Sequence, residues 1–174
     1  SYNWPVVGFL LFMTGIPALP AFFIVSLVLI NTQELSGMAS FINATYFKTP
    51  AAIVVHGVSG ILFFLTMPFQ FSPALRERHI HWHKSAGKVA VLAGYILAIS
   101  GVWMHHVLAP GVFGAAYMSL VIMSATMCLS FTLALWHILH KHIDLHKKWM
   151  VRSVAVTLAV VTPLFVEIIA YVLF

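Results

Sequence analysis

The sequence predicts an all-α integral membrane protein, built as a bundle of five transmembrane helices. Hydrophobic residues make up 61% of the 174 residues and charged residues only 7%, whereas a soluble domain carries about 25% charged residues. The mean hydropathy is +1.00. Five apolar segments are each long enough to cross a bilayer, which takes about 20 residues. A chain with so little polar surface needs lipid as its solvent, so the lipid bilayer is the first predicted partner.

The five segments follow one another as a single transmembrane helical domain over residues 1–174, with no internal repeat. Pro17 and Pro20 should kink the first segment, and Pro163 the fifth. Residues 31–49 form a polar connector, and Ala109-Pro110-Gly111 signals a tight turn. The predicted spans are about 4–30, 51–71, 85–108, 113–139 and 149–174.

Basic residues are distributed unevenly between the two ends of the predicted bundle. Two links carry most of them: Arg76, Arg78, Lys84 and Lys88 flank one, and Lys141, Lys147, Lys148 and Arg152 flank the other. The opposite side has Lys48 alone. The positive-inside rule then predicts a cytoplasmic N-terminus and an external C-terminus. Topology therefore accounts for the net charge of +5 and the pI near 9.6, and nucleic acid is not a predicted partner.

The ten histidines gather near the span ends, which gives two predicted levels of imidazoles. His83 and His146 lie at the inner level, and His56, His105 and His106 at the outer level. His83 and His105 are 22 residues apart, so helical geometry brings them to within roughly 40° on one face, about 33 Å apart along the axis. That face carries only small residues between them: Gly87, Ala90, Gly94, Ala98 and Gly101. Small residues allow either close helix packing or contact with a flat macrocycle, and both interpretations stay open.

Two ionisable residues inside apolar segments are candidates for binding. His56 lies within the second segment, where polar residues are costly and usually face the bundle interior. It is either a ligand or a neutral imidazole bonded to a neighbouring carbonyl. Glu167 is the only acid inside a predicted span. It could pair with a histidine, gate a proton or bind a quinol hydroxyl, or it could reach the outer interface.

The stretch RERHIHWHKSAGK, residues 76–88, combines histidines with arginines and lysines. Most of its charge fits a cytoplasmic anchor, and His79, His81 and His142 fit interfacial links in the same way. Alternating histidines could also bind a transition metal. His83 is the exception, because it opens the small-residue face. The roles of His137 and His140 stay open.

Three sequence pieces together resemble a known family. They are VHGVSGILFFLTMPFQF at 55–71, HKSAGKV at 83–89 and HKKWMVRS at 146–153. They are similar to the bacterial predicted membrane protein family labelled domain of unknown function 2306, over about residues 51–155. The resemblance implies a protein of the bacterial inner membrane. The His105–His106 pair lies outside that pattern. The family layout resembles small transmembrane b-type cytochromes, in which facing histidines ligate haem. The sequence pattern of the domain of unknown function 2306 family matches this chain at His56, Arg76, His83, Gly87, His146, Trp149 and Arg152.

The first predicted function is therefore a b-type cytochrome-like electron-transfer protein that binds one or two haem b groups through histidines of facing helices. The inner ligand pair would be His83 with His146. The outer pair would be His56 with His105, or with His106 if the third span ends irregularly. Arg76, Arg152 and Lys84 would neutralise haem propionates at the inner face. A quinone, with Glu167 as a candidate contact, could complete the electron path.

Two alternatives from other classes stay open. The chain could be a non-catalytic accessory subunit of a larger, respiratory-type membrane complex, which co-purification would test. It could also bind or transport a transition metal through His56, His83, His105 and His146, which elemental analysis would test. No hydrolase is predicted, because the four acids are scattered and no Gly-x-Ser-x-Gly or phosphate-loop motif is present.

Overall fold

The structure, a computed structural model, describes residues 2–30 and 43–173, without the side chains of 164, 167, 168 and 171–173. The described residues form helices and no strand, so the all-α class is confirmed. The chain divides into two compact units, Ser1–Phe113 and Gly114–Phe174, and each is considered by itself. The helices of the first unit are α1 (Trp4–Ile30), α2 (Thr45–Lys48), α3 (Pro50–Thr66), η2 (Pro68–Phe71), α4 (Pro73–Arg78) and α5 (Ile80–Leu108). Those of the second are α6 (Ala115–Leu139) and α7 (Ile143–Leu173).

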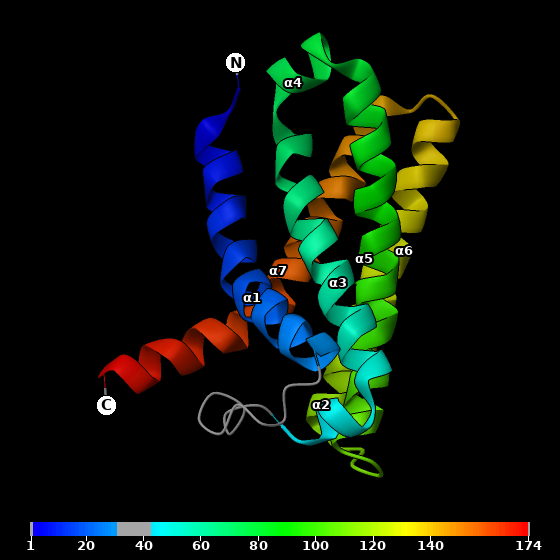
Figure 1. The fold of residues 1–174 in the computed structure, drawn as a ribbon. Helices are drawn as coiled ribbons and strands as arrows, with labels where there is room; N and C mark the ends of the chain where they lie inside the picture. The colour runs from blue at the N-terminus through cyan, green and yellow to red at the C-terminus, as the bar shows by residue number, and fades with distance from the viewer. Residues whose placement is uncertain (1, 31–42, 174) are drawn as a thin grey trace. The chain divides into compact units, whose positions relative to one another are not determined.

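In the first unit, α3 lies between α1 and α5 and packs along both (Figure 1). Glycines of α3 make these approaches possible. A Cβ at Gly57 would overlap the Val25 side chain of α1, whereas a Cβ at Gly60 would lie 3.5 Å from Leu97 of α5. Small residues of this kind bring helix backbones close together, which is a main source of packing energy in a membrane. Pro17 and Pro20 lie inside α1, as predicted, and α1 changes direction along its length (Figure 1).

The N-terminal end of α1 lies beside the link between α3 and α5. Asn3 donates from Nδ2 to the Phe71 carbonyl at 3.4 Å, and Arg78 donates to the Tyr2 hydroxyl at 2.8 Å. The beginning of the chain and the basic link therefore share one end of the first unit, which agrees with the predicted common side. The orientation of that side in a membrane stays a prediction.

The basic link itself is more helical than the sequence suggested. Ser72 caps α4 by accepting a hydrogen bond from the Leu75 amide, and Pro73 occupies the first turn, which is a favourable start for a helix. The break between α4 and α5 falls at His79 alone, with φ −132° and ψ 59°. The link between the second and third predicted spans is thus mostly helical, and IHWH at 80–83 forms the first turn of α5.

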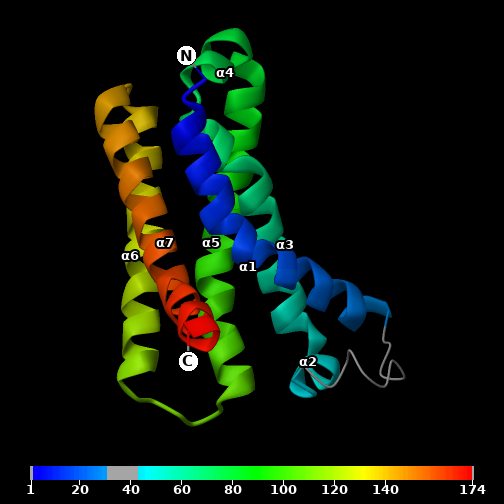
Figure 2. The same cartoon turned by 90° about the vertical axis from the view of Figure 1, so that its left-hand side faces the viewer.

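The second unit is a helical hairpin in which α6 packs along α7 (Figure 2). Small and medium side chains are buried on the two helices, among them Ser130 and Ala134 on α6 and Ser153 and Thr157 on α7. Thr157 donates to the Met127 sulfur at 3.4 Å, so a polar contact joins the two helices. Pro163 lies inside α7, and the C-terminal half of α7 departs from the direction of the rest (Figure 1).

Four helical stretches within the described residues are long and apolar enough to span a membrane: Trp4–Ile30, Pro50–Phe71, Ile80–Leu108 and Ala115–Leu139. They match the first four predicted spans to within about five residues. Large apolar side chains such as Phe12 and Leu19 are exposed on them, as contact with lipid requires. The chain is an integral membrane protein. The fifth predicted span corresponds to α7, which begins at Ile143 rather than 149, and the count of five spans stays a prediction.

Candidate functional site: anchored histidines

His56 is the histidine most firmly fixed within the first unit. Its Nδ1 lies 3.0 Å from the Ser100 Oγ on α5. The Ser100 hydroxyl donates a hydrogen bond to the Leu97 carbonyl at 3.3 Å. Its oxygen can therefore only accept a hydrogen bond from His56. Nδ1 of His56 therefore carries the proton and donates it to Ser100, and the neutral ring keeps its lone pair on Nε2. The free nitrogen is the one that commonly binds a metal.

The surroundings of this contact hold the His56 ring in place. Ser59, one turn further along α3, donates to the His56 carbonyl at 2.8 Å. Both Ser59 and Ser100 are almost fully buried. Gly57 and Gly60 bring α1 and α5 close to α3 on either side of this segment. The sequence predicted a neighbouring carbonyl as one possible His56 partner, and the structure places both the Ser100 hydroxyl and the Leu97 carbonyl within hydrogen-bond reach of the ring.

His105 and His106, the outer-level histidines of α5, lie on other sides of that helix than the side that meets His56. His105 donates from Nε2 to the Val112 carbonyl at 2.9 Å, which leaves Nδ1 as its other nitrogen. It follows Ser100 by five residues, which turns it about 140° around the helix from the side that meets His56. His106 is rotated by about 120° the other way. The contacts of the first unit thus join His56 to Ser100, and the outer pair His56 with His105 or His106 stays a prediction.

The small-residue face of α5 is used for packing at its inner end. A Cβ at Gly87 would lie 3.1 Å from the Gln70 side chain, which leaves little room beside this glycine. Ala90, Gly94 and Ala98 are buried. These observations favour the helix-packing interpretation around Gly87. His83, one turn before Gly87, is half-buried, and so is Arg76 on α4.

In the second unit His146 is anchored in the same manner as His56. Its Nδ1 donates to the Ala134 carbonyl at 2.9 Å, and a carbonyl can only accept, so the neutral ring keeps its lone pair on Nε2. Ala134 is fully buried and His146 half-buried. Because His83 belongs to the first unit and His146 to the second, the inner pair stays a prediction.

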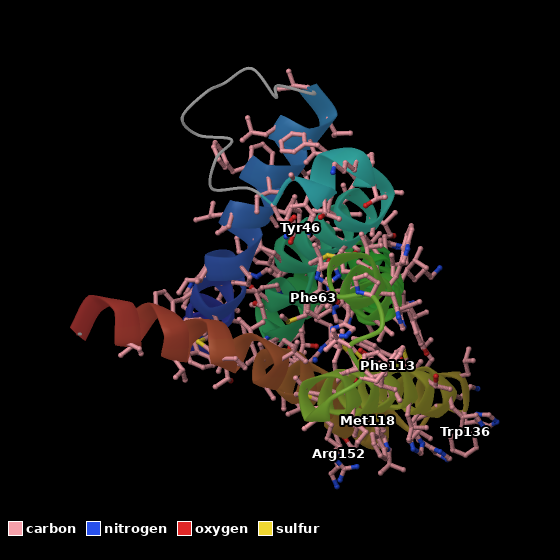
Figure 3. The ribbon with its side chains drawn as sticks, turned by 90° about the horizontal axis from the view of Figure 1, so that it is seen from below. Tyr46, Phe63, Phe113, Met118, Trp136 and Arg152 are labelled. Atoms are coloured by element: carbon pink, nitrogen blue, oxygen red, sulfur yellow. The ribbon has the colours of Figure 1, made fainter. Side chains whose placement is uncertain are left out.

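Two further predicted site residues lie on α7. The Arg152 guanidinium stacks over the Trp149 ring at 4.3 Å from its centroid, an arrangement that leaves its N–H groups available to an anion. Arg152 is exposed and labelled in Figure 3. Glu167 lies in α7, but its side chain is outside the described residues, and its role stays a prediction.

The residues that anchor the two imidazoles were missing from the predicted site. Ser100 and the Ala134 carbonyl are both within apolar segments, and only Ser100 carried a sequence signal, as a hydroxyl within a span. No three histidine, cysteine, aspartate or glutamate side chains among the described residues are grouped so that they could hold a metal ion.

Comparison with known proteins gives one match. The family model described as "Predicted membrane protein (DUF2306)" matches residues 53–174. No curated protein and no solved structure matches the chain.

Proposed function

The chain belongs to the DUF2306 family of predicted membrane proteins, and from that premise we propose that it is a haem-binding, b-type electron-transfer protein of the membrane. Each unit supplies one proposed axial ligand, Nε2 of His56 in the first unit and Nε2 of His146 in the second, and the two are considered separately. One observation carries the proposal: both imidazoles are half-buried, and both have Nδ1 committed to a protein acceptor.

Metal-binding histidines almost always donate their other ring N–H to a carbonyl, a carboxylate or water, which fixes the tautomer and raises the basicity of the ligand nitrogen. His56 and His146 meet this requirement through Ser100 and Ala134. A histidine that serves as a ligand must present one particular nitrogen in one direction, so it needs a fixed tautomer and ring orientation. An exposed histidine has no such need.

The nature of the ligand set favours haem over a bare metal ion. A structural metal ion such as Zn²⁺ takes about four ligands from the protein, and neither His56 nor His146 is grouped with two further such side chains in the described part of the chain. Haem brings four nitrogens of its own and asks the protein for one or two axial ligands. When bound it would supply one-electron redox chemistry, while the protein residues hold and orient it. Arg152 and Arg76 would offer positive charge to the propionates.

The test is an optical spectrum of the purified full-length chain, expressed with ample haem, recorded as reduced minus oxidised. We expect a Soret band and an α band. His56→Ala and His146→Ala should each lose or shift them. His140→Ala is the matched control, because His140 also donates from Nδ1 to a carbonyl, that of Trp136, yet is exposed. Absence of both bands from the wild-type protein would sink the proposal, and equal effects of all three variants would argue against these ligands.

A further inference from the structure

The corner between α6 and α7 is built by a specific helix-ending turn. The Lys141 amide donates to the Ile138 carbonyl at 3.1 Å, and the His142 amide donates to the His137 carbonyl at 2.8 Å. Lys141 has a φ of 63°. This is the Schellman pattern, with Lys141 in the left-handed position that glycine usually occupies.

The same turn brings two histidines together. In a Schellman turn the residue after the left-handed position contacts the residue five before it, and this contact is usually hydrophobic. Here those two residues are His142 and His137, and their ring centroids lie 5.9 Å apart. The backbone therefore holds an imidazole pair where an apolar pair would ordinarily close the helix.

One nitrogen of this pair stands out. Nδ1 of His137 is buried and has no hydrogen-bond partner among the described residues, although a buried polar atom normally finds one. The His142 ring beside it is exposed. His140 differs, because its Nδ1 is committed to the Trp136 carbonyl at 2.8 Å and its ring lies against Trp136.

We propose that His137 and His142 form a binding site for a late first-row divalent metal ion such as Cu²⁺ or Zn²⁺. With metal–nitrogen bonds of about 2.0–2.1 Å, two imidazoles on one ion have centroids roughly 5 to 6.5 Å apart, and the observed 5.9 Å lies within that interval. The ion would bind the lone pair of His137 Nδ1. Since no third suitable side chain is grouped with the pair in the described residues, water completes the coordination shell. Imidazole suits these ions, and Cu²⁺ binds it most tightly.

This site uses neither of the proposed haem ligands and needs no haem, although the His146 amide donates to the His142 carbonyl at 3.0 Å. Its charge environment is moderate: Lys147 is paired with Asp144 at 3.6 Å, and Lys141 is exposed to solvent. Trp136 provides a local reporter, with its ring 4.8 Å from that of His137 and 6.3 Å from that of His142. Figure 3 labels Trp136, with nitrogen-bearing side chains gathered beside it.

The experiment is a Cu²⁺ titration of the full chain in detergent micelles, purified through a tag without histidine and followed by tryptophan fluorescence. We expect saturable quenching that Trp136→Phe largely removes, and nitrogen couplings from two imidazoles in the electron paramagnetic resonance spectrum. Zn²⁺, a closed-shell ion, should compete without quenching. His142→Gln should weaken binding about tenfold or more, because a direct ligand is lost.

His140→Gln is the matched control, since it changes a neighbouring imidazole that has a different hydrogen-bond role, and it should bind Cu²⁺ as the wild type does. His56→Ala and His146→Ala should also leave the titration unchanged, so the outcome is distinguishable from that of the haem proposal. Loss of binding in His140→Gln equal to that in His142→Gln, or unchanged binding in His142→Gln, would overturn the site and show only adventitious copper at surface histidines.

Discussion

The Nδ1 of His56 and the Oγ of Ser100 lie 3.0 Å apart, and this contact joins α3 to α5 within the apolar part of the first unit. The Ser100 hydroxyl donates a hydrogen bond to the Leu97 carbonyl. Its oxygen therefore accepts the hydrogen bond from His56 Nδ1. This arrangement leaves Nε2 of His56 as the proposed ligand nitrogen, and it gives Ser100 two separable roles, one in stability and one in the electronic character of His56.

Replacing Ser100 by alanine should affect both roles. The loss of one buried hydrogen bond should cost about 1 kcal/mol of stability. In haem-loaded protein, the His56 ring would lose its acceptor, become a weaker donor to iron and raise the midpoint potential. Thermal unfolding in detergent and a redox titration measure the two effects.

Ser59→Ala is the control for the Ser100 variant. Ser59 is equally buried and donates to a carbonyl, that of His56, without touching the His56 ring. It should lose some stability and leave the potential unchanged. A potential that moves equally in both variants would contradict the role of Ser100 in tuning His56.

The approach of α1 to α3 depends on Gly57. An alanine there would place its Cβ into the Val25 side chain, and overpacking of this kind costs about 1–3 kcal/mol. We expect Gly57→Ala to lower the thermal unfolding midpoint, and the double variant Gly57→Ala with Val25→Ala to recover part of the loss. Gly60→Ala is the comparison, because a Cβ there meets Leu97 at an ordinary 3.5 Å. Equal destabilisation by both single alanines would mean that the contact with Val25 is unimportant.

The helices themselves were largely predictable, because a long apolar run in lipid has to satisfy its backbone internally and therefore becomes a helix. The spans at 4–30 and 113–139 illustrate this, since α1 has the predicted bounds and α6 differs by two residues at its start. The structure of the basic link between α3 and α5 was harder to predict. Its charge suggested only an interfacial anchor, although Ser72 followed by Pro73 is a recognisable helix start.

The site was predictable only in part, since sequence spacing relates residues of one helix to each other and says little about the rotation of that helix against its neighbour. His56 was found because a histidine in an apolar run is unusual. Ser100 was missed because its partner depends on how α5 turns toward α3. His105 was placed with His56 by depth alone, and that pair stays a prediction.

The left-handed turn at Lys141 gives a prediction about stability. A residue with a Cβ pays about 1–2 kcal/mol for a positive φ, and glycine pays little. Lys141→Gly should therefore raise the thermal unfolding midpoint while the imidazole pair keeps its Cu²⁺ binding. Lys148→Gly, at an exposed position inside α7, should lower the midpoint, because glycine costs about 1 kcal/mol in a helix interior. A lower midpoint for Lys141→Gly would contradict the Schellman assignment.

Ser153 tests the packing of the second unit. Its side chain is fully buried, on the side of α7 that also carries Thr157, and Thr157 contacts Met127 of α6. Its hydroxyl bonds only to the carbonyl of Trp149 one turn back, so Ser153→Ala should change stability by less than about 1 kcal/mol. Ser153→Leu has no space for its added volume and should cost about 1–3 kcal/mol, measured by thermal unfolding in micelles. Val151→Leu, on an exposed position of the same helix, should have almost no effect. If Ser153→Leu were as stable as Val151→Leu, the close approach of α6 and α7 at this level would be wrong.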